Sequence, residues 1–537
     1  MKRFVVVFAV AALMFGPQYA SYAQSRDFKL GKGLEIEYAV LRELAASYVD
    51  TVDFEKMLVK GVQEMLATLD PYTVYITEDE EEDFELMTTG NYGGVGAIIR
   101  KLPGEGVKII EPYEGSPASK FGLQPGDVIV EIDGIPVFDE TSQQSSDRMK
   151  GQPGTEVRFK VVKGRTKDTV NITVVRERIH VSDLTYAGMY QDSVGYISIS
   201  GFTDKLSSEV RGAMTALKQA GAKQMILDLR GNGGGVMEEA IKMVSLFVPK
   251  GTMVVSSKGR DGADERKYFS ADAPVDTVMP LLVMVNGESA SASEITAGAI
   301  KDLGRGTIAG TRTFGKGLIQ SIRPMPYSTR MKLTTGRYYT PSGRCVQAID
   351  YSKRHEDGTV ERDADGGIAP DIEVESKAYS RPMVSLIYND ILGSYAIEYF
   401  KAHESIPAPE DFHLTDKEYE DFVAYASEQD FDARSSAQTA LDALIKAAKQ
   451  EDLYDLYKDE IEALSAKVNM DKTQMLKAKK DEIKGVLETE IATCYYFARA
   501  SVPVSFRYDV QLREAVRLWQ EKLTGEAPMQ ASAPMHP

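Results

Sequence analysis

The sequence predicts a multidomain α/β protein that ends in a helical region. Its 537 residues are enough for three or four domains. Short apolar runs compatible with β-strands, such as 224–228 and 280–285, end in glycine-containing turns, and helix-compatible residues resume after them. After about residue 376, apolar residues recur in steps of three and four, which is typical of amphipathic helices.

The first 23 residues have the three features of a secretory signal peptide. Met1-Lys-Arg3 is basic, the stretch from Phe4 to Gly16 is apolar, and Ser21-Tyr-Ala23 fits a small-x-small cleavage site. No later stretch approaches the roughly twenty apolar residues that a transmembrane helix needs. We therefore expect an exported protein with no integral membrane segment after signal removal.

Charge and cysteine content narrow the choice of partners. A net charge of −17 argues against nucleic acid, because phosphate binding needs a basic face. The two cysteines, Cys345 and Cys494, fall in different predicted regions. In an exported protein they could pair or remain as two free thiols, and the sequence leaves both open.

A glycine-rich module follows the N-terminal segment. Gly93-Gly94-Val95-Gly96 precedes two short β-like runs, and residues 115–134 read Gly-Ser-Pro-Ala-Ser-Lys-Phe-Gly-Leu-Gln-Pro-Gly-Asp-Val-Ile-Val-Glu-Ile-Asp-Gly. This module resembles a PDZ domain. The resemblance implies that Gly93 to Gly96 offer backbone donors to a substrate's C-terminal carboxylate while a sheet edge accepts the peptide as an added strand. The alternative is a simple turn into the first strand.

One segment departs from the PDZ pattern. Residues 141–149 stand where the second PDZ helix belongs, and they contain few apolar residues to line a groove for a hydrophobic side chain. The sequence therefore predicts a PDZ-like fold and leaves its peptide specificity open.

A candidate nucleophile lies at a strand-to-helix junction. The run 280–285 ends at Asn286-Gly287, and the helix begins after Ser291. A serine there sits beside free backbone N–H groups that can stabilise an oxyanion. Ser289 and Ser293 stand in alternation with Ser291, and spacing alone does not separate the three; a small-residue helix start is the non-functional alternative.

A lysine is the candidate base. The five histidines have no recognisable catalytic surroundings, which disfavours a Ser-His-Asp site. Lys316 can act instead if burial lowers its pKa and leaves a neutral amine. In an extended segment, Gln320 would share a face with Lys316 and could hold its amine toward Ser291. The alternative is an ordinary Gly-Lys-Gly loop.

Residues 310–316 also fit the nucleotide-binding pattern G-x-x-x-x-G-K. Gly317 stands where that pattern needs Ser or Thr for magnesium, and the following residues read as a strand instead of a helix. We therefore set the nucleotide interpretation aside.

These segments together resemble the carboxyl-terminal processing peptidases, also called tail-specific proteases. The motifs that carry the resemblance are Ser289-Ala-Ser-Ala-Ser-Glu294, Gly-Arg-x-x-x-x-Gly, Thr313-Phe-Gly-Lys-Gly-x-x-Gln320 and Asp228-Leu-Arg-Gly-Asn-Gly-Gly-Gly235. The resemblance implies a crotonase-like ββα core, a serine-lysine mechanism and cleavage near substrate C-termini. It selects Ser291 as the nucleophile.

The resemblance also assigns the oxyanion donors. The glycine turn after the strand 224–228 would supply the backbone N–H of Gly234, and Ala292 would supply the second N–H. A tight strand-to-helix turn without catalytic function is the alternative. Segment 338–344 resembles a family segment that we interpret as scaffold. Glu294 could ligate a metal, but no His or Cys cluster accompanies it, so we expect neither a metal nor a cofactor.

The expected organisation follows from these observations. The divisions are a signal peptide at 1–23, an N-terminal helical segment at 24–90, a PDZ-like domain at 91–178, a peptidase core at 179–375, a helical C-terminal domain at 376–524 and a disordered tail at 525–537. We expect protein or peptide substrates with free C-termini, a periplasmic location and a homo-oligomer through the C-terminal helices. The alternative function is a non-catalytic PDZ-type scaffold with a vestigial peptidase core.

Overall fold

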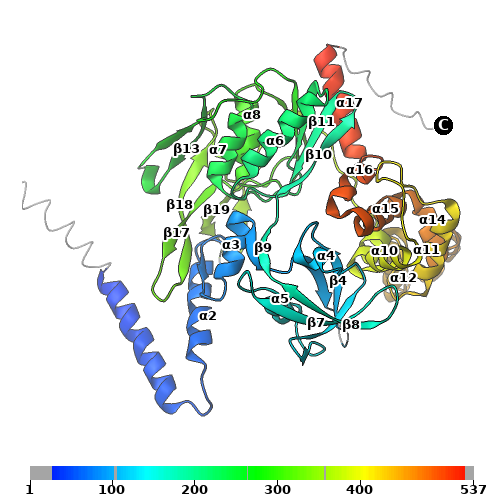
Figure 1. The fold of residues 1–537 in the computed structure, drawn as a ribbon, viewed down its shortest axis with the longest axis horizontal. Coiled ribbons are helices and arrows are strands. Elements are labelled where there is room, and N and C mark those ends of the chain that lie inside the picture. Colours follow the sequence, from blue (N-terminus) through cyan, green and yellow to red (C-terminus); the bar gives the residue numbers. More distant parts are fainter. Residues whose placement is uncertain (1–26, 102–103, 105, 263, 356–357, 526–537) are drawn as a thin grey trace, which may run out of the picture. The chain divides into compact units, whose positions relative to one another are not determined.

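The computed structural model describes residues 27–101, 104, 106–262, 264–355 and 358–525 (Figure 1). The predicted signal peptide and nearly all of the predicted tail lie outside the described residues. The chain forms two compact units, with the division between Thr77 and Glu78.

The first unit is mainly helical. Residues 27–47 form one helix, and α2 (Phe54–Ala67) and β1 (Val74–Ile76) follow it. Asp53 begins α2 by accepting the Lys56 N–H on its side chain at 3.0 Å. Apolar side chains of both helices remain exposed, among them Phe28, Leu34 and Met65.

The second unit begins with α3 (Glu81–Thr89) and then the region that resembles a PDZ domain. Its main sheet has the antiparallel order β3-β4-β5-β7-β8, with β6 paired to β5, and a separate ribbon pairs β2 with β9. Alternate residues of β7, Val157, Phe159 and Val161, are buried in its core. The strands are β2 (Asn91–Gly94), β3 (Ala97–Lys101), β4 (Val107–Pro112), β5 (Val128–Ile132), β6 (Ile135–Pro136), β7 (Glu156–Val162), β8 (Thr169–Val175) and β9 (Glu177–His180), and the helices are α4 (Pro117–Lys120) and α5 (Ser142–Met149).

A central sheet in the order β10-β11-β12-β15-β16-β21 follows. Every pairing from β11 to β21 is parallel, and β10 is antiparallel to β11. The central strands β11, β12 and β15 are mostly buried and rich in apolar residues because both faces of the sheet are covered. The strands are β10 (Leu184–Gln191), β11 (Val194–Ile199), β12 (Gln224–Asp228), β15 (Leu281–Val285), β16 (Thr307–Gly310) and β21 (Ile372–Glu373).

Side chains that alternate along each strand enter two different cores. Leu281, Val283 and Val285 pack with α6 (Leu206–Gln219), α7 (Met237–Ser245) and α8 (Ala292–Asp302). Leu282 and Met284 face the other way and pack with the last helix, α17 (Val510–Thr524), through residues that include Trp519. The helix at the C-terminal end of the chain, red in Figure 1, therefore covers one face of the central sheet.

Another sheet of this unit contains strands in the order β17-β18-β13-β14. Its strands are β13 (Met253–Lys258), β14 (Arg266–Phe269), β17 (Leu318–Pro324) and β18 (Arg330–Tyr339), and a short ribbon pairs β19 (Ile349–Arg354) with β20 (Val360–Arg362). The long β17–β18 hairpin connects the predicted lysine loop to segment 338–344.

The remaining helices form their own apolar core, as the periodicity after residue 376 predicts. Phe422, Leu476 and Leu487 are among its fully buried residues. The helices are α9 (Arg381–Tyr388), α10 (Ile391–Ala402), α11 (Asp416–Glu428), α12 (Ser436–Gln450), α13 (Lys458–Val468), α14 (Lys472–Ala478), α15 (Lys480–Tyr496) and α16 (Ser501–Ser505).

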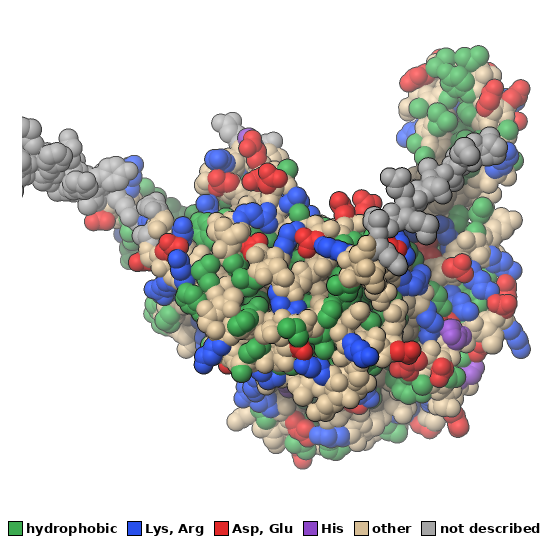
Figure 2. All heavy atoms as spheres, turned by 90° about the horizontal axis from the view of Figure 1, so that it is seen from above, with side chains coloured by type: hydrophobic (Ala, Val, Ile, Leu, Met, Phe, Trp, Pro, Cys, Tyr) green, Lys and Arg blue, Asp and Glu red, His purple; other side chains and the backbone are tan. Residues whose placement is uncertain are grey.

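Within the described residues, no helix is long and apolar enough to cross a membrane. Cys345 and Cys494 are both free thiols, and burial raises the pKa of Cys494 to about 12. On the face in Figure 2, Lys and Arg side chains lie interspersed with Asp and Glu.

Candidate active site

Ser291 occupies the sharp turn between β15 and α8. Its φ of 56° and ψ of −113° lie in a region that residues with a side chain rarely adopt. Such a backbone needs support from its surroundings, and it occurs most often at functional sites. Ser291 is half-buried at the N-terminus of α8.

The two neighbouring serines are in a different environment. Ser289 and Ser293 are fully buried. The Ser289 hydroxyl donates to the Leu229 carbonyl at 2.7 Å, and the Ser293 hydroxyl donates to the Asn232 carbonyl at 2.9 Å. Both side chains therefore tie the Ser291 turn to the glycine turn after β12, while Ser291 is the more accessible of the three.

A buried carboxylate joins the Ser291 turn to the lysine loop. Glu294 Oε2 accepts the backbone N–H of Ser291 at 2.9 Å and the backbone N–H of Lys316 at 2.8 Å. Its Oε1 accepts the Thr313 hydroxyl at 2.6 Å and the Gly315 N–H at 2.7 Å. Burial raises the pKa of Glu294, and these four donors oppose that increase.

A buried hydroxyl joins the same two segments from the carbonyl side. Tyr338 Oη lies 3.1 Å from the Ser291 carbonyl oxygen and 2.7 Å from the Lys316 carbonyl oxygen, and its single proton is shared between them. Burial and the Glu294 charge raise the pKa of Tyr338 well above its ordinary value, so this hydroxyl stays protonated. The backbones of Ser291 and Lys316 are thus held through both their N–H and C=O groups.

Lys316 lies in the loop before β17, and Gln320 lies within β17. Gln320 Nε2 donates to Thr334 Oγ1 at 3.2 Å across the β17–β18 pair. The pairing of these two strands is irregular between Ile319 and Gln320. The predicted glutamine is therefore anchored by a threonine of the neighbouring strand.

The glycine turn after β12 lies directly against Ser291. At Gly234, with φ of 99°, a Cβ atom would stand 2.7 Å from Ser291 Cβ and 2.9 Å from the Ala292 nitrogen. Only glycine fits this approach. The Gly234 N–H donates to Asn232 Oδ1 at 2.9 Å, so any donation to a substrate oxyanion has to share or replace that bond.

The predicted carboxylate loop begins within a ribbon. Gly93 and Gly94 belong to β2 and pair with β9, Val95 is buried, and Gly96 has φ of 75°. A hydrogen bond links the Gly96 backbone to the Tyr92 hydroxyl. The adjoining strand β3 stands at the end of its sheet and contacts α5, which is the helix expected at 141–149.

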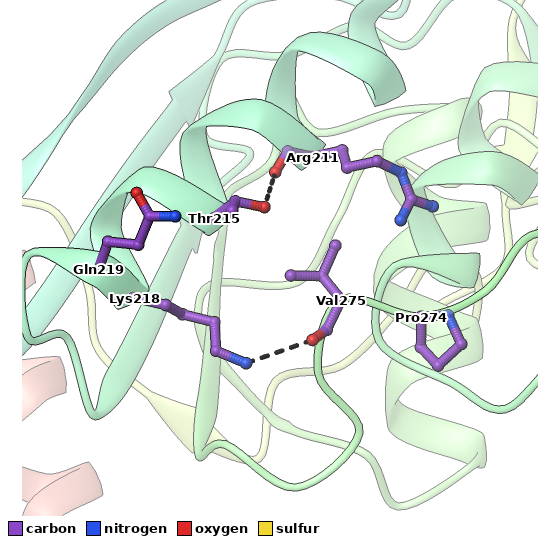
Figure 3. A pocket seen from close by; sticks show the side chains of 6 residues that line it. All are labelled: Arg211, Thr215, Lys218, Gln219, Pro274 and Val275. Carbon is purple, nitrogen blue, oxygen red and sulfur yellow. Dashed lines mark hydrogen bonds between the residues drawn. The ribbon is translucent and has the colours of Figure 1, made fainter.

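A surface pocket lies elsewhere in this unit. Arg211, Thr215, Lys218 and Gln219 of α6 line it, together with Pro274 and Val275 (Figure 3). The Lys218 ammonium donates to the Val275 carbonyl at 3.2 Å and pairs with Asp276 at 2.6 Å. None of the residues of the Ser291 site lines it. Among the described residues, no group of three His, Cys, Asp or Glu side chains could hold a metal ion.

Several supporting residues were not identified from the sequence. Glu294 has a sequence signal for its role, because Ser291-x-x-Glu294 has the spacing of a capping box, in which the third helical residue accepts the N-cap N–H. Segment 338–344 was interpreted as scaffold, and no sequence signal indicates that Tyr338 reaches two distant backbones. No sequence signal indicates the partners of Arg230 either.

Three parts of the chain match known families. Residues 193–374 match peptidase family S41, residues 108–163 match a PDZ domain, and residues 383–519 match the family described as "Probable PDZ-protease, C-terminal helical domain". The first region holds β11 to β21, the second runs from β4 to β7, and the third runs from α9 to α17.

Two curated relatives extend the comparison. The chain is 32% identical to the carboxy-terminal-processing protease of Bartonella bacilliformis over 69% of this chain and 82% of the relative. It is 30% identical to the carboxy-terminal processing protease CtpA of Bacillus subtilis over 62% of this chain and 69% of the relative. A solved structure titled photosystem II D1 C-terminal processing protease is 28% identical, covers 63% of this chain and 86% of that chain, and has a TM-score of 0.34.

The fold and the families it matches define a serine-type peptidase that carries a PDZ domain. The chain belongs to peptidase family S41, with the carboxy-terminal processing proteases.

Proposed function

We propose that Ser291 is the nucleophile and Lys316 the general base of this peptidase. Lys316 takes the Ser291 proton as Oγ attacks the substrate carbonyl, and Lys316 then gives that proton to the leaving amine as the peptide bond breaks. Water hydrolyses the resulting acyl-enzyme. The single observation that carries the proposal is the double connection of the two backbones by Glu294 and Tyr338.

Gly234 and Ala292 are the proposed oxyanion donors. Their support is the close approach of Gly234 to Ser291 and the position of Ala292 as the first residue of α8, where its N–H is not used by the helix. Gln320 is proposed to orient the Lys316 amine from β17. In this role the Gln320 amide would stay hydrogen-bonded to Thr334, which holds the side chain in place.

We propose that the enzyme cleaves proteins near their C-termini, with the PDZ domain binding the free carboxylate. A peptide would add to the end strand β3 and place its carboxylate at the loop of Gly93, Gly94, Val95 and Gly96. The support is the position of β3 at the end of its sheet with α5 beside it.

Export to a periplasm is part of the proposal, and its support is the signal-like composition of residues 1–23. Homo-oligomerisation through the C-terminal helices is a further part. Leu444 of α12 and Leu464 of α13 are 48% and 45% exposed, which leaves apolar surface for a second copy. A monomeric mass by light scattering would remove this part of the proposal.

The test is cleavage of an unstructured protein with an apolar C-terminus by the chain from Gln24. Three reactions are compared: wild type, Ser291→Ala, and wild type with the C-terminus of the substrate amidated. Loss of turnover in Ser291→Ala supports the nucleophile, and slower cleavage of the amide supports carboxylate binding. Stoichiometric binding without turnover by wild type would favour the scaffold alternative.

A further inference from the structure

Arg230 connects the glycine turn after β12 to the N-terminus of α17. Its Nε donates to Asp228 at 3.0 and 2.9 Å. Its Nη2 donates to Asp509 Oδ2 at 2.7 Å, and its Nη1 donates to Gln511 Oε1 at 3.0 Å and to Asp509 Oδ1 at 3.3 Å. All three guanidinium nitrogens are therefore bound by two elements that lie far apart in the sequence.

This ion-paired group is shielded from water. The side chains of Asp228, Arg230 and Asp509 are 6%, 18% and 20% exposed. The Tyr196 hydroxyl donates to Asp228 as well. A buried charge that loses its partner is costly, so the three charged groups hold one another in a fixed arrangement.

The α17 end of the connection is itself fixed to the central sheet. Asp509 caps α17 by accepting the Leu512 N–H at 2.8 Å. Gln511 Nε2 donates to the Val374 carbonyl at 2.7 Å, beside the end strand β21. Leu512 and Trp519 are buried against the sheet. Arg230 therefore meets an anchored helix end.

The other end of the connection leads to the Ser291 site within a few residues. The Gly231 N–H donates to Asn286 Oδ1 at 3.0 Å. The Asn232 carbonyl accepts the Ala290 N–H at 3.0 Å and the Ser293 hydroxyl at 2.9 Å, and Asn232 Oδ1 accepts the Gly234 N–H. A shift of Arg230 would thus move the turn that carries Gly234 relative to Ser291.

We propose that Asp509 and Gln511 are positioning residues for the oxyanion-binding turn. Through Arg230, the last helix of the C-terminal helical region sets the position of the Gly234 N–H, so this region takes part in transition-state stabilisation as well as in folding. The inference rests on the proposed function, because it assigns a support to the oxyanion site proposed there.

The main test variant is Asp509→Asn in the full mature chain. Asparagine caps helices as well as aspartate does, so α17 keeps its start while Arg230 loses a charged partner. The expected result is a fall in kcat of about tenfold or more, as for a disturbed oxyanion donor, with KM within about twofold. The matched control is Glu514→Gln, which removes an α17 carboxylate that pairs with the exposed Arg517 instead.

A second readout separates positioning from a general loss of structure. A peptide aldehyde, which forms a tetrahedral adduct with an oxyanion, should bind Asp509→Asn more weakly by the same factor as kcat/KM falls. Binding of an uncleaved peptide in the Ser291→Ala background should not change. Gln511→Ala, which leaves the charges in place, should show the same pattern with a smaller fall in kcat and serves if Asp509→Asn does not fold.

The outcomes are distinguishable from those for the proposed function. Activity in Ser291→Ala equal to wild type contradicts the proposed function itself. An inactive Ser291→Ala together with unchanged kcat in Asp509→Asn and Gln511→Ala overturns the positioning role alone. Equal losses in aldehyde and peptide binding also overturn it, because they indicate a general structural effect.

Discussion

Ser291 and Lys316 share the partners of both their backbone groups. Glu294 Oε2 accepts the N–H of each at 2.9 and 2.8 Å, and Tyr338 Oη lies within hydrogen-bonding distance of the carbonyl of each, at 3.1 and 2.7 Å. The turn between β15 and α8 and the loop before β17, which belong to different sheets, are thereby held together. On Ser291 and Lys316 these four contacts use only backbone atoms.

Removing the Tyr338 hydroxyl tests the carbonyl side of this arrangement. Tyr338→Phe leaves the ring packed but withdraws the donor shared by the two carbonyls. We expect kcat to fall by roughly tenfold or more with little change in KM, because a small displacement of reacting groups is costly. Steady-state kinetics measure the effect, with Tyr339→Phe at the neighbouring tyrosine as the control. Equal kcat values for both variants and wild type would contradict the prediction.

Replacing the Glu294 carboxylate tests the hydrogen bonds from the backbone N–H groups of Ser291 and Lys316. Glu294→Gln presents an NH2 group to at least one pair of buried donors, and each unsatisfied buried N–H costs about 1–3 kcal/mol. Thermal unfolding should shift to lower temperature, and cleavage should fall with it. Glu288→Gln, an exposed glutamate on the same turn, is the control and should match wild type. A Glu294→Gln enzyme with wild-type stability would show that the four bonds contribute little.

Glycine at position 234 is required for close approach to Ser291. Gly234→Ala places a Cβ 2.7 Å from the Ala290 carbonyl oxygen and from Ser291 Cβ, at a positive φ. We expect activity to be lost. At Gly233 a Cβ would meet nothing within 4 Å, so Gly233→Ala should remain active. Values of kcat/KM for the two variants test this expectation. Similar losses in both would argue against a specific contact between position 234 and Ser291.

Stability should depend on pH through Glu490, a half-buried acid of α15. Burial raises the pKa of Glu490 above its ordinary value of 4.5, although the Arg100 charge lowers it in part. The folded state therefore binds this proton more tightly than the unfolded state does. The resulting stability is complete below pH 4.5 and is lost as the pH rises through the raised pKa.

Glu490→Gln should therefore melt at a higher temperature than wild type at neutral pH, and the difference should vanish near pH 4. Melting curves across this range measure it. The control is Glu398→Gln, whose side chain is 55% exposed and pairs with Lys401. A difference that persists unchanged at low pH would assign the effect to packing instead of charge.

The parts that sequence predicts well are those encoded by local patterns. The strand at 281–285, the helix from Ala292 and the C-terminal helices follow from apolar periodicity, and the PDZ and peptidase regions follow from motifs. The choice of Ser291 over Ser289 and Ser293 depended on resemblance to a family. In the structure, the two neighbours are buried and bonded to carbonyls of the glycine turn.

The parts that sequence did not predict are contacts between distant segments. The Tyr338 hydroxyl contacts backbone carbonyls in two separate loops. Arg230 pairs with Asp509, which lies close to the C-terminal end of the described residues. No local pattern encodes such a pairing, because each residue alone is compatible with an ordinary surface or scaffold role. The assignment of α17 to a face of the central sheet depends on the same kind of long-range packing.

The position of α17 also has a consequence for the order of folding. One face of the central sheet, with Val194, Tyr196 and Leu282, is covered by the last helix of the chain. During synthesis from the N-terminus, the α17 residues that pack on that face, Trp519 among them, are made after the sheet itself. The long loop that must close also makes this contact slow to form. A chain that lacks α17 would therefore expose part of an apolar sheet face, which makes it prone to aggregation. The active site would be complete only after α17 has packed on the sheet.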